Sequence, residues 1–510
     1  MRSPVSVDDS ILAHITQSLL HHTETVAVAC LPSDQPPSKR GGVRIPCFKR
    51  PGCKRLVVAF SGGVDSTVLL HGLVAAVTQS LIPYSLSSIV AIHINHQLSP
   101  QSDVWQQHCQ QYAEGLGVTF YSENVTVVSS GKGVESAARD ARYQVFEHFL
   151  QEDDGLLLGH HQDDQAETVL LRLFRGAGVK GLSAMPRSRP IIPCTSSLTT
   201  RQPLLARPLL SLSQEIITTY AQQHQLFWVE DESNQSDRYD RNFLRNKVIP
   251  LLMPRWPAIV SQLSKTAETM TQTNVLLAEV AEEDLQQLDH QKARTGFSID
   301  CVLLSRLSLP RKNNVLRHWC EKVAYAPPDN DQLGQIEQQF LSRSASLSSA
   351  CVSWGSYELR QFSGRLYLMQ AVPKFSRTSV VEWDGVTDLD LQEAGVLRVS
   401  SSDSLHPNKE TAQTGICIKQ QPYQIQWRQG GERCTPSHRD HSQTIKKLLQ
   451  EYGLETWLRD RVPLIYTGDE LVAVGDLWVN KGFDLSKKSR VNVGPTNKQS
   501  VVCIKWDAVK

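Results

Sequence analysis

The stretch LVVAFSGGVDSTVLLHGL, residues 56–73, decides the fold that we expect for this chain of 510 residues. It joins a continuous apolar run, LVVAF (56–60), to a glycine-rich turn, SGGVDS (61–66), and then to a helical pattern from about Thr67. A continuous apolar run fits a strand that is buried on both faces of a parallel sheet. The stretch therefore predicts the first strand, turn and helix of a doubly wound α/β fold.

The alternation of strands and helices continues beyond this stretch. Strand-like runs at IVAIHIN (89–95), VTFYSENV (118–125) and GLLLGHH (155–161) each precede a helical pattern. Strands that alternate with helices are typical of a parallel sheet covered on both faces. We therefore expect an α/β domain at 52–254, preceded by an N-terminal helix and loop extension at 1–51.

In the second half of the chain the expected secondary structure changes twice, first to helices and then to short strands. Pro257 fits the first position of a long helix, and more helical patterns follow without a strand. We expect 255–375 to be mainly helical and to end in a hairpin around Ser363 and Gly364. Short strands then predict a small module at 385–510. The fold class is thus a doubly wound parallel sheet, followed by a helical domain and a small mixed α/β C-terminal domain.

Bulk composition excludes several classes of protein. Hydrophobic residues make up 40% and charged residues 21%, and 53 Lys plus Arg nearly balance 52 Asp plus Glu, for a net charge of +1. A nucleic-acid partner would therefore have to bind local basic patches. No run approaches the roughly 18 apolar residues that span a bilayer, so we expect a cytoplasmic protein that binds no membrane. The eleven cysteines include no C-x-x-C pair, and we expect them to be reduced thiols.

The turn SGGVDS has the residue types of a phosphate site. Its two glycines can adopt positive φ, which lets successive backbone N–H groups converge at the N-terminus of a helix. The turn has no lysine, which excludes the G-x-x-x-x-G-K-[ST] loop. Two glycines alone fit a plain structural turn better, but Asp65 beside a phosphate requires a cation such as Mg²⁺. The residues expected to bind the nucleotide are Ser61, Gly62, Gly63, Val64, Asp65 and Ser66.

The acidic turn GHHQDDQAET follows the fourth strand, at the edge where open α/β folds bind ligands. Asp163 and Glu167 are four residues apart and share a helix face with Asp164 nearby, so their like charges repel. One acid would merely complement the helix dipole, but three exceed that need. We therefore expect Mg²⁺ or an ammonium group here. Whether His160 and His161 bind a ligand or make structural hydrogen bonds stays open.

A basic stretch follows, because the chain has no acidic residue between Glu167 and Glu215. Its basic residues are Arg172, Arg175, Lys180, Arg187, Arg189, Arg201 and Arg207. Such a run indicates a surface for a polyanion, and the alternative is a solvated loop without a partner. Further along, Arg241 and Arg245 share one helical face, which suits contact with phosphate or carboxylate.

Taken together, a series of motifs in a fixed order resembles the tRNA(Ile)-lysidine synthetase family, whose ATP site is the PP-loop of the N-type ATP pyrophosphatases. In the first half the motifs are SGGVDS, HINHQLS (93–99), ESAARDARY (135–143), GHHQDDQAET, RGAGVKGLSAM (175–185), RPLL (207–210), EDESN (230–234) and RNFLR (241–245). In the C-terminal module they are RQGGERCTP (428–436), IKKLLQEYGLETWLRDRVPLIY (445–466) and LVAVGDLWV (471–479). The chain departs from the family pattern at Ser99, where an arginine is common, and at 26–51 and 194–202, which look like insertions.

The resemblance implies a carbon–nitrogen ligase that uses ATP and Mg²⁺. Its substrates would be free L-lysine and tRNA(Ile) with the anticodon CAU, and lysine would be joined to C2 of the wobble cytidine through an adenylated intermediate. The product, lysidine, changes decoding from AUG to AUA, and ATP is converted to AMP and pyrophosphate. The domain at 52–254 would then bind ATP, and the two later domains would bind the tRNA.

The resemblance also implies roles for individual residues. The catalytic set would be Asp65 and Glu167 for Mg²⁺, Asp163 and Asp164 for recognising or deprotonating lysine, and Arg241 and Arg245 for AMP or the cytidine. The tRNA contacts would be Arg172, Arg175, Lys180, Arg207, Arg433, Lys446, Lys447, Arg459 and Arg461.

Alternatives within and outside this chemistry stay open on the sequence. A tRNA thiolase of the same fold would normally carry a C-x-x-C pair, which is missing. An amidotransferase would need a nucleophilic cysteine in a second domain or at the N-terminus, and residue 2 is arginine. A catalytically inactive tRNA-binding protein would be expected to lose Asp65, Asp163 or Glu167, and all three remain. A homodimer is also possible, because the sequence does not decide the oligomeric state.

Overall fold

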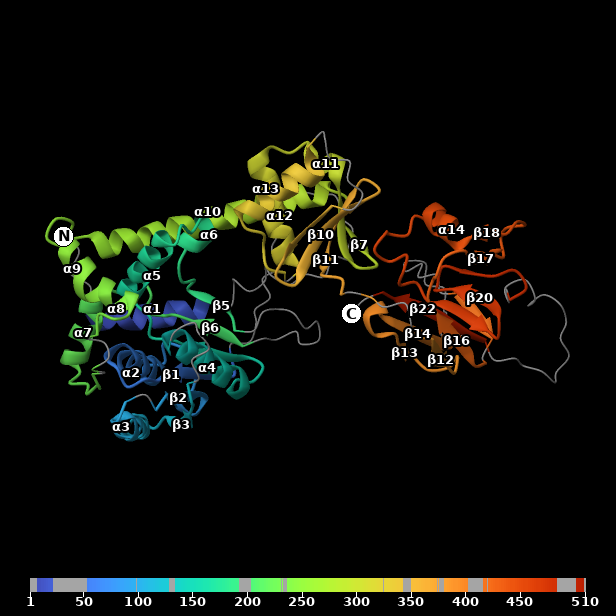
Figure 1. Cartoon of the computed structure of the whole chain (residues 1–510). Coiled ribbons are helices and arrows are strands. Elements are labelled where there is room, and N and C mark those ends of the chain that lie inside the picture. The colour runs from blue at the N-terminus through green and yellow to red at the C-terminus, as the bar shows by residue number, and fades with distance from the viewer. Residues whose placement is uncertain are drawn as a thin grey trace, which may run out of the picture. The chain divides into compact units, whose positions relative to one another are not determined.

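The chain forms two compact units, Met1–Leu277 and Ala278–Lys510 (Figure 1). The computed structural model describes residues 7–21, 53–97, 99–127, 134–191, 203–230, 232, 236–323, 325–342, 350–373, 375, 380–401, 416–419, 421–483 and 501–508. Within these ranges, no helix is both long and apolar enough to cross a membrane. Both expected insertions, at 26–51 and 194–202, lie outside the described residues.

A six-stranded sheet in the order β3-β2-β1-β4-β6-β5 organises the first unit. Its strands are β1 (Arg55–Ala59), β2 (Ile89–Asn95), β3 (Thr119–Asn124), β4 (Asp154–Leu157), β5 (Ser188–Pro190) and β6 (Leu204–Ala206). β1 pairs in parallel with both β2 and β4, whereas the edge strand β5 runs antiparallel to β6. The doubly wound sheet is thus confirmed, and its strand order reverses between β1 and β4, where such folds bind ligands.

Helices cover both faces of this sheet. The helices of the first unit up to the long helix α10 are α1 (Val7–His21), α2 (Val64–Thr78), η2 (Leu86–Ser88), α3 (Ser102–Gly115), α4 (Val134–Phe149), α5 (Gln162–Phe174), α6 (Val179–Leu182), α7 (Gln214–Gln223), α8 (Asp240–Phe243), η4 (Leu244–Val248) and α9 (Ile249–Leu252). Leu56 and Val58 of β1 pack in one core with α1, α2 and α7, and Val57 packs in another with α4. Successive residues therefore face opposite sides of the sheet, as the two-residue period of a strand requires.

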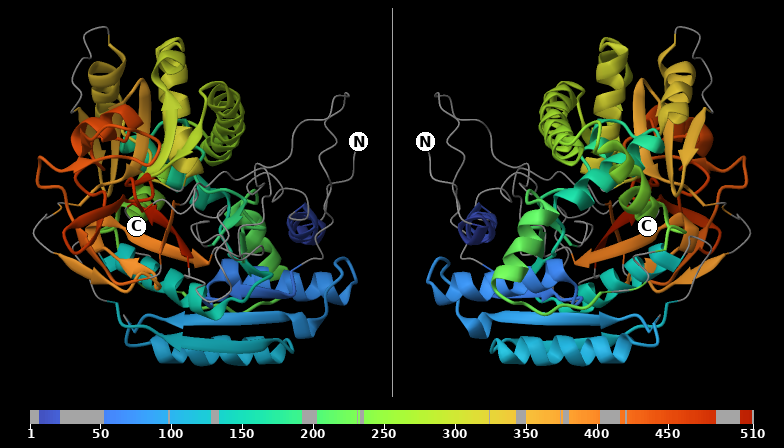
Figure 2. Two further views of the ribbon diagram at one scale, coloured as in Figure 1. Left: turned by 90° about the vertical axis from the view of Figure 1, so that its right-hand side faces the viewer. Right: turned by 90° about the vertical axis from the view of Figure 1, so that its left-hand side faces the viewer.

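The N-terminal helix α1, the dark blue helix that Figure 2 shows end-on, is part of the first of these cores. Ile11, Ile15 and Leu19 are buried at the four-residue spacing of a helix face. A Cβ atom at Gly72 of α2 would lie 2.8 Å from Cδ1 of Ile15, closer than real Cβ atoms approach. Glycine at this position therefore allows α1 and α2 to pack closely.

The long helix α10 (Ile259–Gln287) follows the first sheet and contains the boundary between the two units. It begins two residues after Pro257, so the prediction that Pro257 occupies the first helical position is wrong. The turn before the helix instead closes with a hydrogen bond of 3.0 Å from the Ile259 N–H to the Trp256 carbonyl.

The second unit begins with helices packed on an antiparallel sheet in the order β7-β8-β11-β10-β9. The helices are α11 (Cys301–Ser305), α12 (Leu309–Lys322), α13 (Asn330–Ile336) and η5 (Glu337–Leu341). The strands are β7 (Gln291–Ala293), β8 (Gly296–Asp300), β9 (Cys351–Trp354), β10 (Tyr357–Phe362) and β11 (Arg365–Gln370). The hairpin around Ser363 and Gly364 is confirmed. β7 and β8 correct the expectation of helices without strands, because β8 gains its second partner, β11, only far along the chain.

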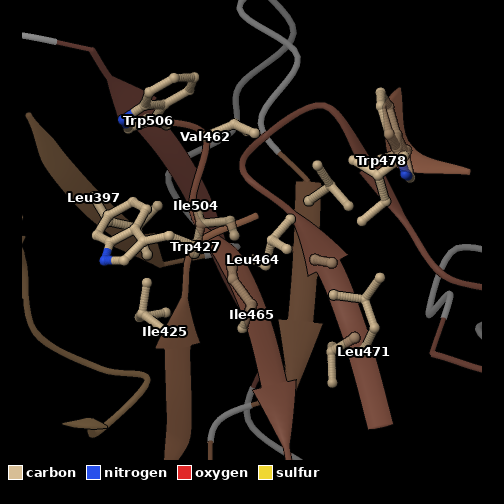
Figure 3. Close-up of a cluster of buried hydrophobic side chains, with 14 of the residues drawn as sticks. Leu397, Ile425, Trp427, Val462, Leu464, Ile465, Leu471, Trp478, Ile504 and Trp506 are labelled. Carbon is tan, nitrogen blue, oxygen red and sulfur yellow. The ribbon is translucent and has the colours of Figure 1, made fainter. Parts of the chain in front are cut away.

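The rest of the second unit is built from two antiparallel sheets, β12-β16-β19-β20-β21 and β13-β14-β22-β15, and a short ribbon of β17 and β18. Side chains from both larger sheets, Ile425 of β16 and Trp506 of β22 among them, meet in one core (Figure 3). The elements are β12 (Val381–Trp383), β13 (Leu389–Asp390), η6 (Gln392–Ala394), β14 (Val396–Ser401), β15 (Ile416–Lys419), β16 (Tyr423–Gln426), β17 (Arg433–Cys434), β18 (Gln443–Thr444), α14 (Ile445–Tyr452), β19 (Leu464–Thr467), β20 (Glu470–Val474), β21 (Trp478–Val479) and β22 (Val501–Asp507).

The free cysteines of the described residues follow the expectation of reduced thiols, and a disulfide corrects it elsewhere. The free cysteines among the described residues are Cys53, Cys109, Cys301, Cys320, Cys351 and Cys434. Cys503, on β22, is disulfide-bonded, which corrects the expectation there.

We expect Ile15→Ala to lower the free energy of unfolding by about 2–4 kcal/mol, because it leaves a cavity between α1 and α2. Urea denaturation of the full chain measures this change. Ala13→Ser, on the exposed side of α1, is the control and should change stability by less than about 0.5 kcal/mol. An unfolding midpoint that Ile15→Ala leaves unchanged would show that α1 contributes nothing to this core.

Candidate functional site

The glycine-rich turn between β1 and α2 is stabilised by hydrogen bonds between its side chains and its own backbone. Gly62 has φ +85°, and a Cβ atom there would lie 2.8 Å from Cys109 Sγ, so only glycine fits. The Ser66 hydroxyl donates to the Gly63 carbonyl at 3.0 Å and accepts from the Ser61 N–H at 3.2 Å. Gly63 caps α2 without a side-chain hydrogen bond, so the first N–H groups of the helix have no side-chain cap. The geometry suits a phosphate group.

The acidic turn after β4 packs directly against this loop. A Cβ atom at Gly159 would lie 3.0 Å from the carbonyl carbon of Asp65 and 3.1 Å from the backbone nitrogen of Ser66. Glycine therefore lets the two turns approach backbone to backbone. The two motifs that the sequence analysis treated separately form one site at the carboxyl edge of the sheet.

A buried ion-pair cluster lies on α5 and the helices that follow Tyr239. Arg241 and Arg245 each place Nε 2.6 Å from a different oxygen of Glu167. Their Nη2 atoms donate to Oδ1 of Asp164 at 2.8 and 3.0 Å. Glu167 is fully buried, so both of its oxygens are occupied inside the protein. The two arginines are thereby fixed in orientation by two carboxylates.

The charges of this cluster stabilise one another. Burial alone would raise the pKa of Asp164, but His161 and Arg241 outweigh burial and hold that pKa well below its ordinary value. Burial would likewise lower the pKa of Arg241 and Arg245, but Asp164 and Glu167 outweigh it and raise both. Arg245 lies in η4, a π-helical turn, which is a deviation from the α-helix often found at functional sites. Asp164, Arg241 and Arg245 are therefore charged at neutral pH.

His161 lies at the centre of the remaining acids. Its Nε2 is 3.7 Å from Asp65 and 3.4 Å from Asp164, and its Nδ1 is 3.5 Å from Asp163. Burial alone would lower the pKa of His161, but these carboxylates outweigh burial and raise it to about 9. His161 is thus a charged group within the site, and its contact with a ligand stays a prediction.

Gln214, at the start of α7, is a site residue that the sequence analysis missed. Its backbone N–H donates to Asp163 at 3.2 Å, and its side-chain amide donates to Asp65, also at 3.2 Å. It therefore holds the two acids whose side chains are about one third exposed, at 33% for Asp65 and 32% for Asp163. Nothing in the sequence marks Gln214, because one glutamine after a serine has no distinctive pattern.

Asp65 and Glu167 differ in how well they could bind Mg²⁺. Asp65 fits, because its carboxylate is accessible and lies beside a phosphate loop, and Mg²⁺ typically takes one or two carboxylates plus substrate phosphates. Glu167 fits poorly, because guanidinium groups occupy both of its oxygens. Within the described residues, no three His, Cys, Asp or Glu side chains converge in a way that would hold a metal without a substrate.

Some of the basic residues expected to contact tRNA in the first unit also have partners within the protein. Arg172 donates to the carbonyls of Gly181 and Ala184 at 2.7 and 2.8 Å, so it holds the segment after α5. Arg207 is 3% exposed. Arg175 and Lys180 are exposed, as expected of contacts with a macromolecule. Arg201 lies outside the described residues.

The expected tRNA contacts of the second unit divide in the same way. Arg433 and the α14 residues Lys446 and Lys447 are exposed. Arg461 is 5% exposed, and its guanidinium donates to the carbonyls of Pro373 and Glu393. Arg459 is half-buried and donates to the Leu454 carbonyl at 2.9 Å. Arg461 and Arg459 therefore stabilise this unit through backbone contacts, and their contact with tRNA stays a prediction.

Family models match three parts of the chain. A PP-loop domain matches residues 45–252, a TilS substrate binding domain matches 300–367, and a TilS substrate C-terminal domain matches 423–493. The first match contains the glycine-rich loop and the buried ion-pair cluster described above.

Relatives of the chain share its sequence over most of its length. A tRNA(Ile)-lysidine synthase from Coxiella burnetii is 36% identical over 429 residues, which are 84% of this chain and 90% of that protein. One from Proteus mirabilis is 36% identical over 459 residues, 89% of this chain and 95% of that protein. One from Legionella pneumophila is 37% identical over 422 residues, 82% of this chain and 90% of that protein.

We expect the stability of the protein to depend on His161 above neutral pH. Because its pKa is raised from 6.5 to about 9 in the fold, its contribution is complete below pH 6.5 and is lost as the pH rises through 9. The free energy of unfolding should fall across this range by up to about 3 kcal/mol more in the wild type than in His161→Asn. Urea denaturation at a series of pH values measures the difference. His148→Asn, an exposed histidine, should keep the wild-type profile.

Proposed function

The chain belongs to the tRNA(Ile)-lysidine synthase family, and from that premise we propose that it joins free L-lysine to C2 of the wobble cytidine of tRNA(Ile) with the anticodon CAU. ATP would be the second substrate, and AMP and pyrophosphate the by-products. The observation that carries this proposal is the contact between the phosphate loop and the acidic turn, where Gln214 links Asp65 to Asp163. One edge of the sheet thus offers a place for a nucleotide beside a place for an ammonium group.

The reaction needs two substitutions because an oxygen on a pyrimidine ring is a poor leaving group. In the first, O2 of the cytidine attacks the α-phosphorus of ATP, and pyrophosphate leaves. In the second, the ε-amine of lysine attacks C2, the C2–O2 bond breaks, and AMP leaves with that oxygen. The ammonium group of lysine must first lose a proton, so the site has to accept one.

The first role of the site is to bind the nucleotide. We propose that the backbone N–H groups and hydroxyls of Ser61–Ser66 hold the phosphates, since α2 begins there without a side-chain cap. Asp65 would hold Mg²⁺, which would offset phosphate charge when bound. Burial raises the pKa of Asp65 above its ordinary value, which a bound cation would reverse.

The second role is to bind lysine. Burial would raise the pKa of Asp163, but the neighbouring His161 outweighs burial and lowers it, so Asp163 is a carboxylate at neutral pH. We propose that its partly exposed side chain recognises the ε-ammonium group. Asp164 is less suited to this role, because its side chain is 11% exposed and already pairs with two arginines.

The third role is to hold the adenylate. Arg241 and Arg245 keep 25% and 39% of their side chains exposed although Glu167 fixes both. We propose that their remaining donors bind AMP or the cytidine, since a fixed guanidinium fork suits phosphate. Glu167 would then position these arginines, in place of the metal role that the resemblance alone implied.

Incubating the purified protein with ATP, labelled lysine and an unmodified tRNA(Ile) transcript should place label in the RNA. Asp65→Ala should abolish the incorporation, because it removes the carboxylate beside the phosphate loop. Replacing the wobble cytidine by uridine should abolish it as well. Equal label in the uridine transcript would reject the proposed target base, and label without release of AMP would reject the adenylated intermediate.

For the second unit, we expect the double variant Lys446→Ala/Lys447→Ala to weaken tRNA binding and to reduce its salt dependence by about one unit of slope per lysine. Filter binding over a range of salt concentrations measures both quantities. Arg461→Ala is the contrasting variant, because its buried guanidinium should affect stability and leave the salt dependence unchanged. A reduced salt slope for Arg461→Ala alone would contradict this division.

A further inference from the structure

The α4 face of the first sheet ends in a row of basic side chains. Alternate residues of β2, β4 and β6 build the apolar core under α4. The same alternation, continued past the carboxyl end of each strand, reaches a basic residue. These residues are His96 after β2, His160 after β4 and Arg207 after β6.

Helix α4 and strand β5 add arginines around a tyrosine in the same region. The guanidinium carbons of Arg139 and Arg189 lie 5.0 and 5.3 Å from the ring centroid of Tyr143. Arg207 interacts electrostatically with the same tyrosine. Arg142, one turn of α4 further on from Arg139, places Nη2 3.3 Å from Nε2 of His96. We call these four arginines and Tyr143 the Tyr143 cluster.

Among the described residues, the Tyr143 cluster has no carboxylate partner. None of its four guanidinium groups forms an ion pair with a carboxylate within the described ranges, in contrast to Arg241 and Arg245. Arg207 is fixed in place by the Pro186 carbonyl at 2.7 Å and by His160 Nδ1 at 3.3 Å. A group of like charges held together by the fold is expected to bind an anion.

His96 provides an independent sign of a missing acceptor. Its Nε2 faces an N–H donor of Arg142, so Nε2 accepts and Nδ1 carries the proton. Nδ1 is buried and has no hydrogen-bond partner among the described residues. A buried donor without an acceptor destabilises a protein, so such donors normally have a ligand or water as partner.

The electrostatics of Tyr143 show which charge the cluster favours. Burial alone would raise the pKa of this tyrosine, but Arg139, Arg189 and Arg207 outweigh burial and lower it. Burial lowers the pKa of Arg207 to about 10; Tyr143 opposes this shift, and Arg189 and Arg139 add to it. The cluster thus favours negative charge at its centre.

We propose that the Tyr143 cluster binds a phosphodiester group of the tRNA, next to the nucleotide that the enzyme modifies. This inference rests on the proposed function, because it takes the RNA from there. The same phosphate chemistry could come from ATP, but ATP already has the loop at 61–66. Arg139 and Arg142 are exposed, and guanidinium groups beside an aromatic ring are typical of surfaces that bind unpaired RNA. His160 connects the two sites, since it contacts Arg207 and directly precedes His161.

The proposal is tested with anticodon stem-loop RNAs in which one phosphate at a time is replaced by an uncharged methylphosphonate. The full chain is compared with Arg139→Gln, Arg142→Gln and the control Arg306→Gln, an exposed arginine of the second unit. We expect wild type and control to lose about tenfold in affinity at one phosphate near the target cytidine. Arg142→Gln should bind unmodified RNA with about tenfold lower affinity than the wild type. Neutralising that one phosphate should then lower its affinity no further. Arg142→Lys, which keeps the charge, should lose less than Arg142→Gln.

The outcomes separate the two proposals. The phosphodiester site would be overturned if the affinity losses from Arg142→Gln and from the methylphosphonate were additive at every phosphate. Unchanged RNA affinity in both Arg139→Gln and Arg142→Gln would overturn it as well. The site would also be overturned if the variants kept their RNA affinity but bound a fluorescent ATP analogue more weakly in the absence of RNA. The bound anion would then belong to ATP. RNA binding with the expected pattern but no lysine incorporation by the wild type would reject the proposed function and leave the phosphodiester site standing.

Discussion

The ion pairs of one buried carboxylate, Glu167, fix the geometry of the site. Both of its oxygens accept from guanidinium groups, which ties α5 to the helices that carry Arg241 and Arg245. Removing one member of such a cluster leaves an unpaired buried charge, which typically destabilises a protein by about 3–5 kcal/mol. The two arginines therefore hold one orientation before any substrate arrives, and a preorganised site loses little conformational entropy on binding.

Much of the first unit could be predicted because its signals are local. β2 has the residues read from the sequence, since a continuous apolar run between turns specifies a strand buried on both faces. β7 and β8 were missed because they are short and their pairing with β11 depends on residues much later in the chain. Pro257 was misplaced because the fixed φ of proline suits a turn before a helix as well as its first residue.

The site was predictable where its chemistry lies in a motif. SGGVDS and GHHQDDQAET combine unusual residue types in a short space, and both lie at the expected edge. The internal partners of Glu167, Arg172 and Arg461 were not predictable, because a charged residue in a sequence does not show whether it binds a ligand or another part of the protein. Gly159 and Gln214 were missed because they act through close approach and bridging, which exist only in three dimensions.

The docking of α1 on α2 has a practical consequence for anyone dissecting this enzyme. α2 begins at the nucleotide loop and carries Gly72 in its middle, under Ile11 and Ile15. Truncating the chain so that it begins at β1 would expose an apolar surface along α2, and exposed apolar surfaces promote aggregation. A truncated protein that contains only the catalytic unit should therefore keep α1 if it is to avoid aggregation.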